Sequence, residues 1–210
     1  METDEQQVEA LKKWWSEHGK TVVAGLVIGI GSVAGWNYWQ SYQISQAELA
    51  SRMYTTLVDA AVSEQHPQVL EQASRLVEQH ADSNYAALAS LVAARSAVAS
   101  GDDAAARRNL EWVVANATMP PMRDLARLRL ARVLQGSGDS AGALAQLDAL
   151  EAASYRALAD ELRGDIRLSQ GDAAAARTAY EQVLADPDLP DPSRRRVELK
   201  LDDLGRPSVS

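Results

Sequence analysis

The chain has 210 residues, contains neither cysteine nor phenylalanine, and carries a formal net charge of −8. Without cysteine there is no disulfide and no lipid-modified cysteine, so a folded part has to be held together by packing alone. From residue 40 onward the sequence holds 18 basic and 24 acidic side chains, an excess of acid that disfavours binding to the phosphate backbone of nucleic acid. Alanine, leucine, arginine, glutamate and glutamine are abundant there, and these helix formers predict an all-α fold.

An uncharged apolar segment begins after Lys20 and ends among aromatic residues. At 1.5 Å per residue, a helix of 18 residues from Thr21 would be about 27 Å long, close to the hydrocarbon thickness of a bilayer. Tryptophan and tyrosine lie on both sides of the segment, as is typical of the two membrane interfaces: Trp14, Trp15, Trp36, Tyr38, Trp39 and Tyr42. The pattern predicts a transmembrane helix over residues 21–39 rather than a buried core helix.

The distribution of basic residues around this segment predicts its orientation. Three lysines precede it, Lys12, Lys13 and Lys20, and no basic residue follows it before Arg52. Basic flanks stay in the cytoplasm, whereas acidic residues have little influence on topology. We therefore expect residues 1–20 to be cytoplasmic and residues 40–206 to form a domain on the other side of the membrane.

A cleaved signal peptide is the alternative interpretation of the N-terminal region. The small residues at 32–34 would suit a cleavage site. An acidic leader of about twenty residues with two adjacent tryptophans differs, however, from the short positive start of a signal peptide. The sequence favours an uncleaved anchor.

The apolar segment also contains two GxxxG patterns, formed by Gly25 and Gly29 and by Gly31 and Gly35. Small residues four positions apart let two helices approach closely in lipid, where packing drives association. These glycines are therefore candidates for contact with another transmembrane helix, although glycine is also common in membrane helices in general.

A repeat runs through the remaining sequence, marked by Gly-Asp at 101–102, 138–139 and 171–172. The glycine is suited to end one helix in a left-handed turn, and the aspartate to cap the next helix. Five, nine and twelve residues after each glycine, apolar residues recur on one helical face: Ala106, Leu110, Val113, Ala143, Leu147, Leu150, Ala176, Tyr180 and Val183. Two helices per unit of about 34 residues predict a tetratricopeptide-like solenoid, with an irregular helical bundle as the alternative.

The sequences on either side of these repeats predict further helices. Residues 47–65 and 67–80 form a divergent first helical pair, and residues 193–204, before Gly205, form a C-terminal capping helix. Gly164 occupies the small-residue position of a first helix, where Ala94 and Ala131 are its counterparts.

Residues suited to catalysis are sparse. His18, His66 and His80 are the three histidines, and no pair of them has the spacing of metal ligands. His80, Asp82 and Ser83 lie close in sequence, but helix capping explains them better than a catalytic triad. We expect no enzyme, no cofactor and no metal; a hydrolase that uses His66 or His80 is the weaker alternative.

A tetratricopeptide-like solenoid binds partners along the groove that its first helices line. The repeat register places Arg95, Arg132 and Asp165 at one equivalent groove-facing position on successive first helices. One turn earlier in the same helices lie Leu91, Leu128 and Glu161. These six residues are candidates for binding an extended peptide or a partner's helix, although ordinary solvated charges are an equally reasonable interpretation.

Several blocks of the sequence, in this order, resemble the ancillary SecYEG translocon subunit family of proteobacterial inner membranes. They are QVEALKKWWSEHGK, GWNYWQSYQ, SNYAALASLVAAR, LRLARVLQ and ALADELRGDIRLSQGDAAAARTAYEQV, and the likeness extends over residues 6–204. The resemblance implies an inner-membrane protein with a cytoplasmic N-terminus and a periplasmic tetratricopeptide-like domain. The implied partners are the SecYEG translocon and a membrane-anchored periplasmic chaperone related to prolyl isomerases.

The function that the resemblance implies is to help pass newly translocated proteins to periplasmic chaperones. The family has no catalytic motif to transfer to this sequence. The alternative function is that of a structural scaffold for another envelope or cell-division complex.

Overall fold

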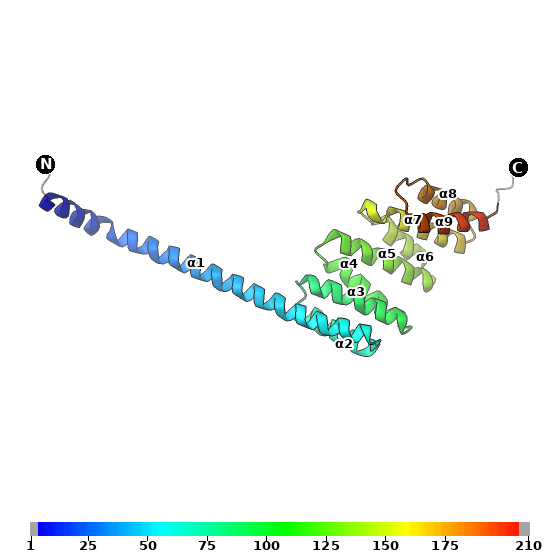
Figure 1. The fold of residues 1–210 in the computed structure, drawn as a ribbon, viewed down its shortest axis with the longest axis horizontal. Coiled ribbons are helices and arrows are strands. Elements are labelled where there is room, and N and C mark those ends of the chain that lie inside the picture. Colours follow the sequence, from blue (N-terminus) through cyan, green and yellow to red (C-terminus); the bar gives the residue numbers. More distant parts are fainter. Residues whose placement is uncertain (1–3, 206–210) are drawn as a thin grey trace. The chain divides into compact units, whose positions relative to one another are not determined.

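The computed structural model of the chain describes residues 4–205, in which all regular structure is helical. The chain divides into two units at Leu49 and Ala50. The helices in chain order (Figure 1) are α1 Asp4–Val62, α2 His66–Gln79, α3 Asn84–Ala99, α4 Asp103–Asn116, α5 Pro120–Gly136, α6 Ser140–Asp148, the short 3-10 helix η1 Ala153–Tyr155, α7 Arg156–Ser169, α8 Ala173–Leu184 and α9 Asp191–Asp203.

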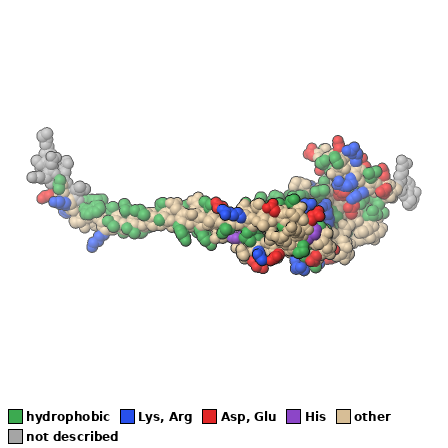
Figure 2. All heavy atoms as spheres, turned by 60° about the horizontal axis from the view of Figure 1, so that its bottom comes forward, with side chains coloured by type: hydrophobic (Ala, Val, Ile, Leu, Met, Phe, Trp, Pro, Cys, Tyr) green, Lys and Arg blue, Asp and Glu red, His purple; other side chains and the backbone are tan. Residues whose placement is uncertain are grey.

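Among the described residues, the first unit is the N-terminal part of α1, and the large apolar side chains of its apolar segment are exposed. The helix over Lys12–Val62 is long and apolar enough to cross a membrane, and only 6% of its most apolar window is buried. Figure 2 shows hydrophobic side chains along this part of α1, with lysines near its beginning. A core helix of a soluble protein would bury such a surface. The prediction of one apolar anchor helix followed by helical repeats is confirmed.

α1 does not end with the apolar segment. We expected separate helices over 21–39 and 47–65, whereas one helix continues from Asp4 to Val62. The residues between the two segments include good helix formers and neither proline nor glycine, so nothing in this stretch terminates the helix. The end of α1 is therefore also the first helix of the repeat domain, where Leu57 and Ala60 belong to one buried cluster with residues of α2 and α3.

The three Gly-Asp turns have the geometry that the sequence predicts. Their glycines have φ between 78° and 86°, a conformation that is free of strain only for glycine. Each following aspartate accepts a hydrogen bond from the backbone N–H three residues later, at 2.8 to 3.0 Å. The turn therefore stops one helix and caps the next within two residues.

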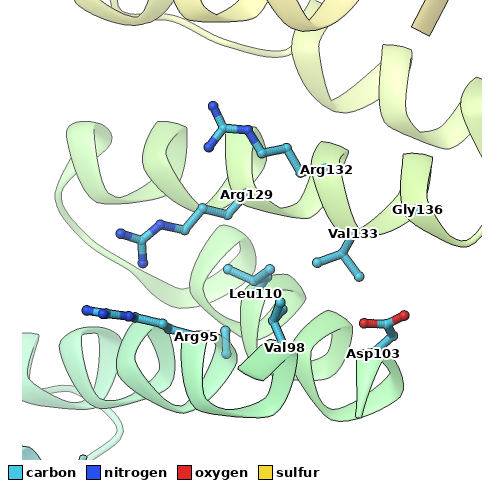
Figure 3. Close-up of a pocket in the computed structure, with 9 residues that line it drawn as sticks. Arg95, Val98, Asp103, Leu110, Arg129, Arg132, Val133 and Gly136 are labelled. Carbon is cyan, nitrogen blue, oxygen red and sulfur yellow. The ribbon is translucent and has the colours of Figure 1, made fainter. Parts of the chain in front are cut away.

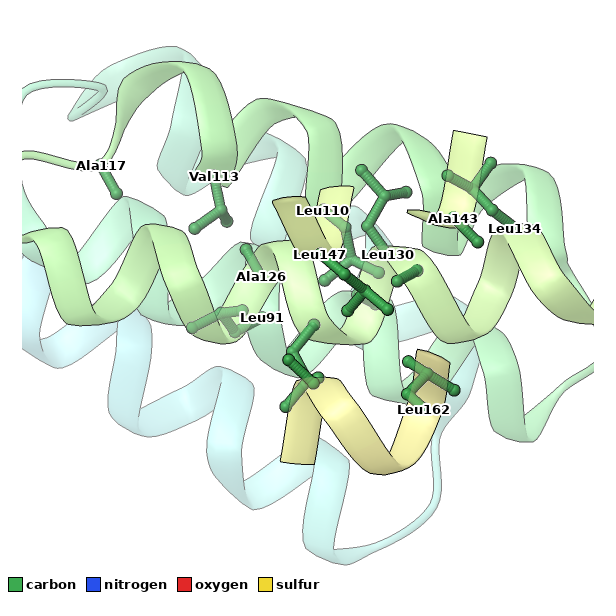
Figure 4. Packing of buried hydrophobic residues seen from close by; sticks show 14 of the residues in the cluster. Leu91, Leu110, Val113, Ala117, Ala126, Leu130, Leu134, Ala143, Leu147 and Leu162 are labelled. Carbon is green, nitrogen blue, oxygen red and sulfur yellow. The ribbon is translucent and has the colours of Figure 1, made fainter. Parts of the chain in front are cut away.

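Alanine and leucine at the repeated positions form the core of the solenoid. Ala106, Ala143 and Ala176 are fully buried where neighbouring helices approach closely. Leucines from α3 to α7 form the central hydrophobic cluster, part of which is shown in Figure 4. Leu150 departs from the expected pattern: α6 ends at Asp148, so Leu150 lies beyond the helix and is half-buried.

Gly164 shows why a small residue is required in a first helix. A Cβ atom at this position would lie 2.3 Å from Cε1 of Tyr180 on α8. Tyr180 is fully buried and donates a hydrogen bond from its hydroxyl to Asp165 Oδ1 at 2.8 Å, so the ring cannot easily move away. α7 and α8 pack closely because position 164 has no side chain.

The last helix, α9, closes the repeat domain as expected, within two residues of the predicted bounds. Val197 is fully buried against the cluster that α8 contributes, together with Tyr180 and Val183. Gly205 follows with a φ of 69°, which ends the helix.

Candidate functional site: a groove along the first helices

Three adjoining hollows follow the first helices of the repeats, and we call them together the repeat groove. The first hollow, between α1 and α3, is lined by Tyr54, Val58, His66, Val92 and Arg95, among others. Arg95 also lines the second hollow, and Arg132 is shared by the second hollow and the third. The groove therefore passes from α1 to α7 within the repeat domain.

The second hollow, which we call the arginine pocket, has a volume of about 470 Å³. Arg95 comes from α3, and Arg129 and Arg132 come from α5. Apolar groups line the rest of the pocket, chiefly Leu110 of α4 with Val98 and Val133. Figure 3 shows the three guanidinium groups pointing to one side, with Asp103 on the other side of Leu110 and Val98.

None of these three arginines forms an ion pair with a carboxylate within residues 4–205. Arg129 is half-buried and makes only a long hydrogen bond, from Nη1 to the Leu91 carbonyl at 3.5 Å. Burial lowers the pKa of Arg129, and repulsion from Arg132 and Arg95 lowers it further. The pocket thus concentrates positive charge over an apolar floor.

The third hollow, which we call the cap hollow, contains carboxylates that are already paired. Glu161 on α7 is 7% exposed and accepts hydrogen bonds from Arg196 at 2.7 and 2.8 Å and from Lys200 at 2.8 Å. Lys200 also reaches Asp165 Oδ1 at 2.7 Å. Hydrogen bonds from Arg196, together with the smaller effect of Lys200, lower the pKa of Glu161 to about 2 against the effect of burial.

The six expected groove residues therefore occupy different environments. Arg95 and Arg132 are exposed on the groove wall, and Asp165 and Glu161 line the cap hollow with partners from α9. Leu91 and Leu128 are in the central core, 5% and 2% exposed. Their expected groove-facing position is corrected by the structure: four residues turn a helix by about 400°, so the leucines lie about 40° around the helix from the arginines and join the central cluster.

Three residues of the groove were missed by the sequence reasoning. Arg129 lies three positions before Arg132 and so shares its helix face, a spacing that could have identified it. Arg196 and Lys200 had no such signal, because they reach α7 from a helix more than thirty residues away.

The histidines of the repeat domain have structural partners. His66 Nδ1 lies 2.7 Å from Ser96 Oγ, and Ser96 is buried. His80 lies at the C-terminus of α2, and Ser83 caps α3 through Tyr85 N. Residues 4–205 contain no group of three or more metal-ligating side chains. Ser83 thus has the helix-capping role that we preferred to a triad.

The glycines of the apolar segment have open space around them. A Cβ atom at Gly25, Gly29, Gly31 or Gly35 would meet nothing within 4 Å. Gly25 and Gly31 are six residues apart, a rotation of about 600°, so the two GxxxG pairs lie on different faces of α1. Each face could accept a separate helix, and their role in packing stays a prediction.

Stacked helix pairs form a groove with exposed side chains, and the helix that precedes them is apolar enough to cross a membrane. These features define the class of the protein: a tetratricopeptide-like binding protein with an anchor helix. Residues 12–206 match the family described as tetratricopeptide repeat-like domain. A solved structure of a Podosopora anserina putative kinesin light chain with nearly identical TPR-like repeats has a TM-score of 0.56 and 23% identity. The alignment covers 78% of this chain and 85% of that one, and it supports the fold alone.

Curated relatives identify the particular family. The ancillary SecYEG translocon subunit of Escherichia coli (strain K12) is 34% identical over 86% of this chain and 86% of its own length. The subunit of the same name from Haemophilus influenzae is 31% identical, over 86% of this chain and 88% of its own length. The chain belongs to the ancillary SecYEG translocon subunit family, and the relatives' names and the repeat fold indicate a non-catalytic adaptor.

Proposed function

We propose that this protein is a non-enzymatic adaptor of the Sec translocon that helps pass newly translocated proteins to periplasmic chaperones. The observation that carries the proposal is the 34% identity to the Escherichia coli ancillary SecYEG translocon subunit, spread over 86% of both chains. The repeat groove supports it, because a chain of hollows between first helices is suited to an extended segment of another protein.

The proposal includes a topology. Residues 1–20 are cytoplasmic, residues 21–39 cross the inner membrane, and residues 40–206 form the periplasmic repeat domain. The lysines before the apolar segment support this orientation. Because the chain has no cysteine, single cysteines introduced at Ser16 and Arg108 can be tested with a membrane-impermeant maleimide. Labelling of R108C alone in spheroplasts is expected, and labelling of S16C would reverse the topology.

The two parts of the chain have separate partners in this proposal. The glycine faces of α1 contact transmembrane helices of SecYEG, since their Cβ positions are open. The repeat groove binds a membrane-anchored chaperone related to prolyl isomerases, through Arg95 and Arg132. Neither contact requires a catalytic group or a cofactor.

Purification of the full-length protein from its native membrane in mild detergent, with mass spectrometry of bound proteins, tests both contacts. We expect wild type to recover translocon subunits and an anchored chaperone. The double variant G25L/G29L should lose the translocon, and R95Q/R132Q should lose the chaperone while retaining the translocon. G31L/G35L, which replaces the glycines of the other face of α1, should also weaken recovery of the translocon. V23I/V27I, which keeps all four glycines, is the matched control for the span.

Recovery of envelope-assembly or cell-division proteins instead would favour the alternative function, a structural scaffold for another complex. Recovery of the protein alone, from membranes in which it is abundant, would contradict the adaptor function.

A further inference from the structure

We infer that the arginine pocket binds an acidic segment of a partner protein, in which carboxylate side chains flank an apolar one. This inference rests on the proposed function of the groove and specifies the chemistry of its ligand. The three arginines would hold the carboxylates, and the floor around Leu110 would receive the apolar side chain.

An acidic protein offers its arginines many intramolecular partners. The chain has 29 acidic residues, and some arginines of the solenoid pair with them: Arg127 with Asp124 at 3.0 Å and Arg163 with Asp160 at 2.5 Å. Arg95, Arg129 and Arg132 lie together on two helices and have no such partner within residues 4–205. Guanidinium groups bind carboxylates through paired hydrogen bonds, so this cluster is complementary to an acidic ligand.

Repulsion within the cluster also favours a bound anion. Burial lowers the pKa of Arg129, and repulsion from Arg132 and Arg95 lowers it further, so the cluster raises its own energy. A bound anion would relieve this repulsion. The net charge of −8 does not offset it locally, because Asp103, the acidic residue of the pocket lining, lies on the other side of the apolar floor (Figure 3).

The apolar floor of the pocket favours a peptide over a small anion. The pocket of about 470 Å³ has its accessible apolar surface at Val98, which is half exposed, and at half-buried Val133, while Leu110 beside them is buried. Uncovered apolar surface beside clustered arginines suits a ligand that carries both an apolar group and carboxylates. A free phosphate or a lipid headgroup would use the arginines and leave the floor uncovered.

The neighbouring hollows predict the course of the bound segment. On the α7 side, the cap hollow presents Glu161 and Asp165, whose partners from α9 are already in place. On the α1 side, the first hollow continues from Arg95 to Tyr54 and Val58 and also contains the carboxylate of Glu64. Because both neighbouring hollows contain carboxylates, the acidic side chains of the bound segment should stay within the arginine pocket.

Fluorescence anisotropy of the full-length protein in mild detergent, with the labelled synthetic peptide GSGDLDGSG as probe, tests the inference. Two control peptides separate the contributions: GSGNLNGSG removes the charge, and GSGDSDGSG removes the apolar side chain. We expect saturable binding of the probe, with affinity about tenfold weaker for the amide peptide and about threefold weaker for the serine peptide.

Variants assign the binding to the pocket. R129Q and R95Q should each weaken probe binding by about three- to tenfold. R108Q is the matched control, since Arg108 is an exposed arginine of α4 that does not line the pocket, and it should bind as wild type. Circular dichroism of each variant checks that the solenoid remains folded.

The inference is overturned if the probe does not bind saturably, if GSGNLNGSG binds equally well, or if R129Q and R95Q behave like R108Q. Displacement by inorganic phosphate or glycerol 3-phosphate, together with equal binding of the serine peptide, would replace it with a phosphate or lipid-headgroup site. Recovery of the translocon in the membrane purification would still support the proposed function after such a failure. Probe binding without that recovery would support the pocket alone.

Discussion

In the repeat groove, the charged side chains of α3 and α5 differ from those of α7 in whether they form ion pairs within the protein. Arg95 and Arg132 have no carboxylate partner among the described residues, whereas the equivalent Asp165 is bound by Lys200 at 2.7 Å. The neighbouring Glu161 is bound by both Arg196 and Lys200. The four side chains of this ion-pair network come from α7 and the capping helix α9.

The difference shows what a capping helix does to a repeat surface. α9 lies against α8 and supplies to α7 the charges that a bound partner would otherwise supply. The cap hollow is therefore satisfied within the chain, and the arginine pocket remains available. We expect changes at the capped end to affect the stability of the fold, and changes at the open end to affect binding.

The largest effect is expected at Gly164. In G164A the new methyl group would lie 2.3 Å from the ring of fully buried Tyr180. Separating α7 from α8 to make room should cost about 2–3 kcal/mol of unfolding free energy, measured by urea unfolding of the full-length protein in mild detergent. Hydrogen–deuterium exchange should rise in α7, α8 and α9.

G136A provides the control for this substitution. Gly136 is also in a helix, at the end of α5, and its Cβ position has open space. The alanine should leave stability unchanged or raise it by up to about 0.5 kcal/mol. If both substitutions had the same effect, close packing of α7 on α8 would not be the reason for glycine at 164.

The next effect is expected on removing the charge of Glu161. E161Q leaves Arg196 without its carboxylate partner and Lys200 with Asp165 alone, although both cations are accessible enough to regain water. We expect a loss of about 1–2 kcal/mol, with faster hydrogen exchange in α9. E111Q breaks an exposed pair with Arg107 at 2.7 Å and should leave the unfolding midpoint unchanged. An equal loss in E111Q would mean that the ion pairs of Glu161 contribute no more to stability than an exposed surface pair does.

Acid should weaken the same contact. Because the pKa of Glu161 is lowered from 4.5 to about 2 in the fold, its contribution is complete above pH 4.5 and is lost as the pH falls toward 2. The stability difference between wild type and E161Q should therefore shrink over this range. Urea unfolding of the two proteins at successive pH values measures it, and a difference that stays constant down to pH 2.5 would contradict the lowered pKa.

Much of the fold could be predicted from the sequence, because its signals are local. The Gly-Asp turns combine a positive φ with an N-cap within two residues, and the alanines recur at a helical period, so neither depends on distant contacts. The continuity of α1 was missed because two functions, membrane anchor and first repeat helix, suggested two helices. No residue between them ends a helix.

The groove was less predictable because it depends on how helices rotate and on what α9 contributes. Register alone placed Leu91 beside Arg95 on the groove wall, but Leu91 lies about 40° around the helix from Arg95 and is part of the central hydrophobic cluster. The sequence shows the charges of Glu161 and Asp165 but not their neutralisation by side chains thirty-five or more residues away. Such long-range contacts have no periodic signal.

The smallest effect on stability is expected at the open end of the groove. R95Q and R132Q remove exposed charges that make no ion pair among the described residues, so each should change the unfolding free energy by less than about 0.5 kcal/mol. The double variant should be slightly more stable than wild type, since it removes both charges that repel Arg129. Urea unfolding of both single variants and the double variant measures this. A loss of unfolding free energy above about 1 kcal/mol would show that Arg95 and Arg132 stabilise the fold, as the ion pairs of α9 with α7 do. The arginine pocket and the cap hollow would then have the same structural role.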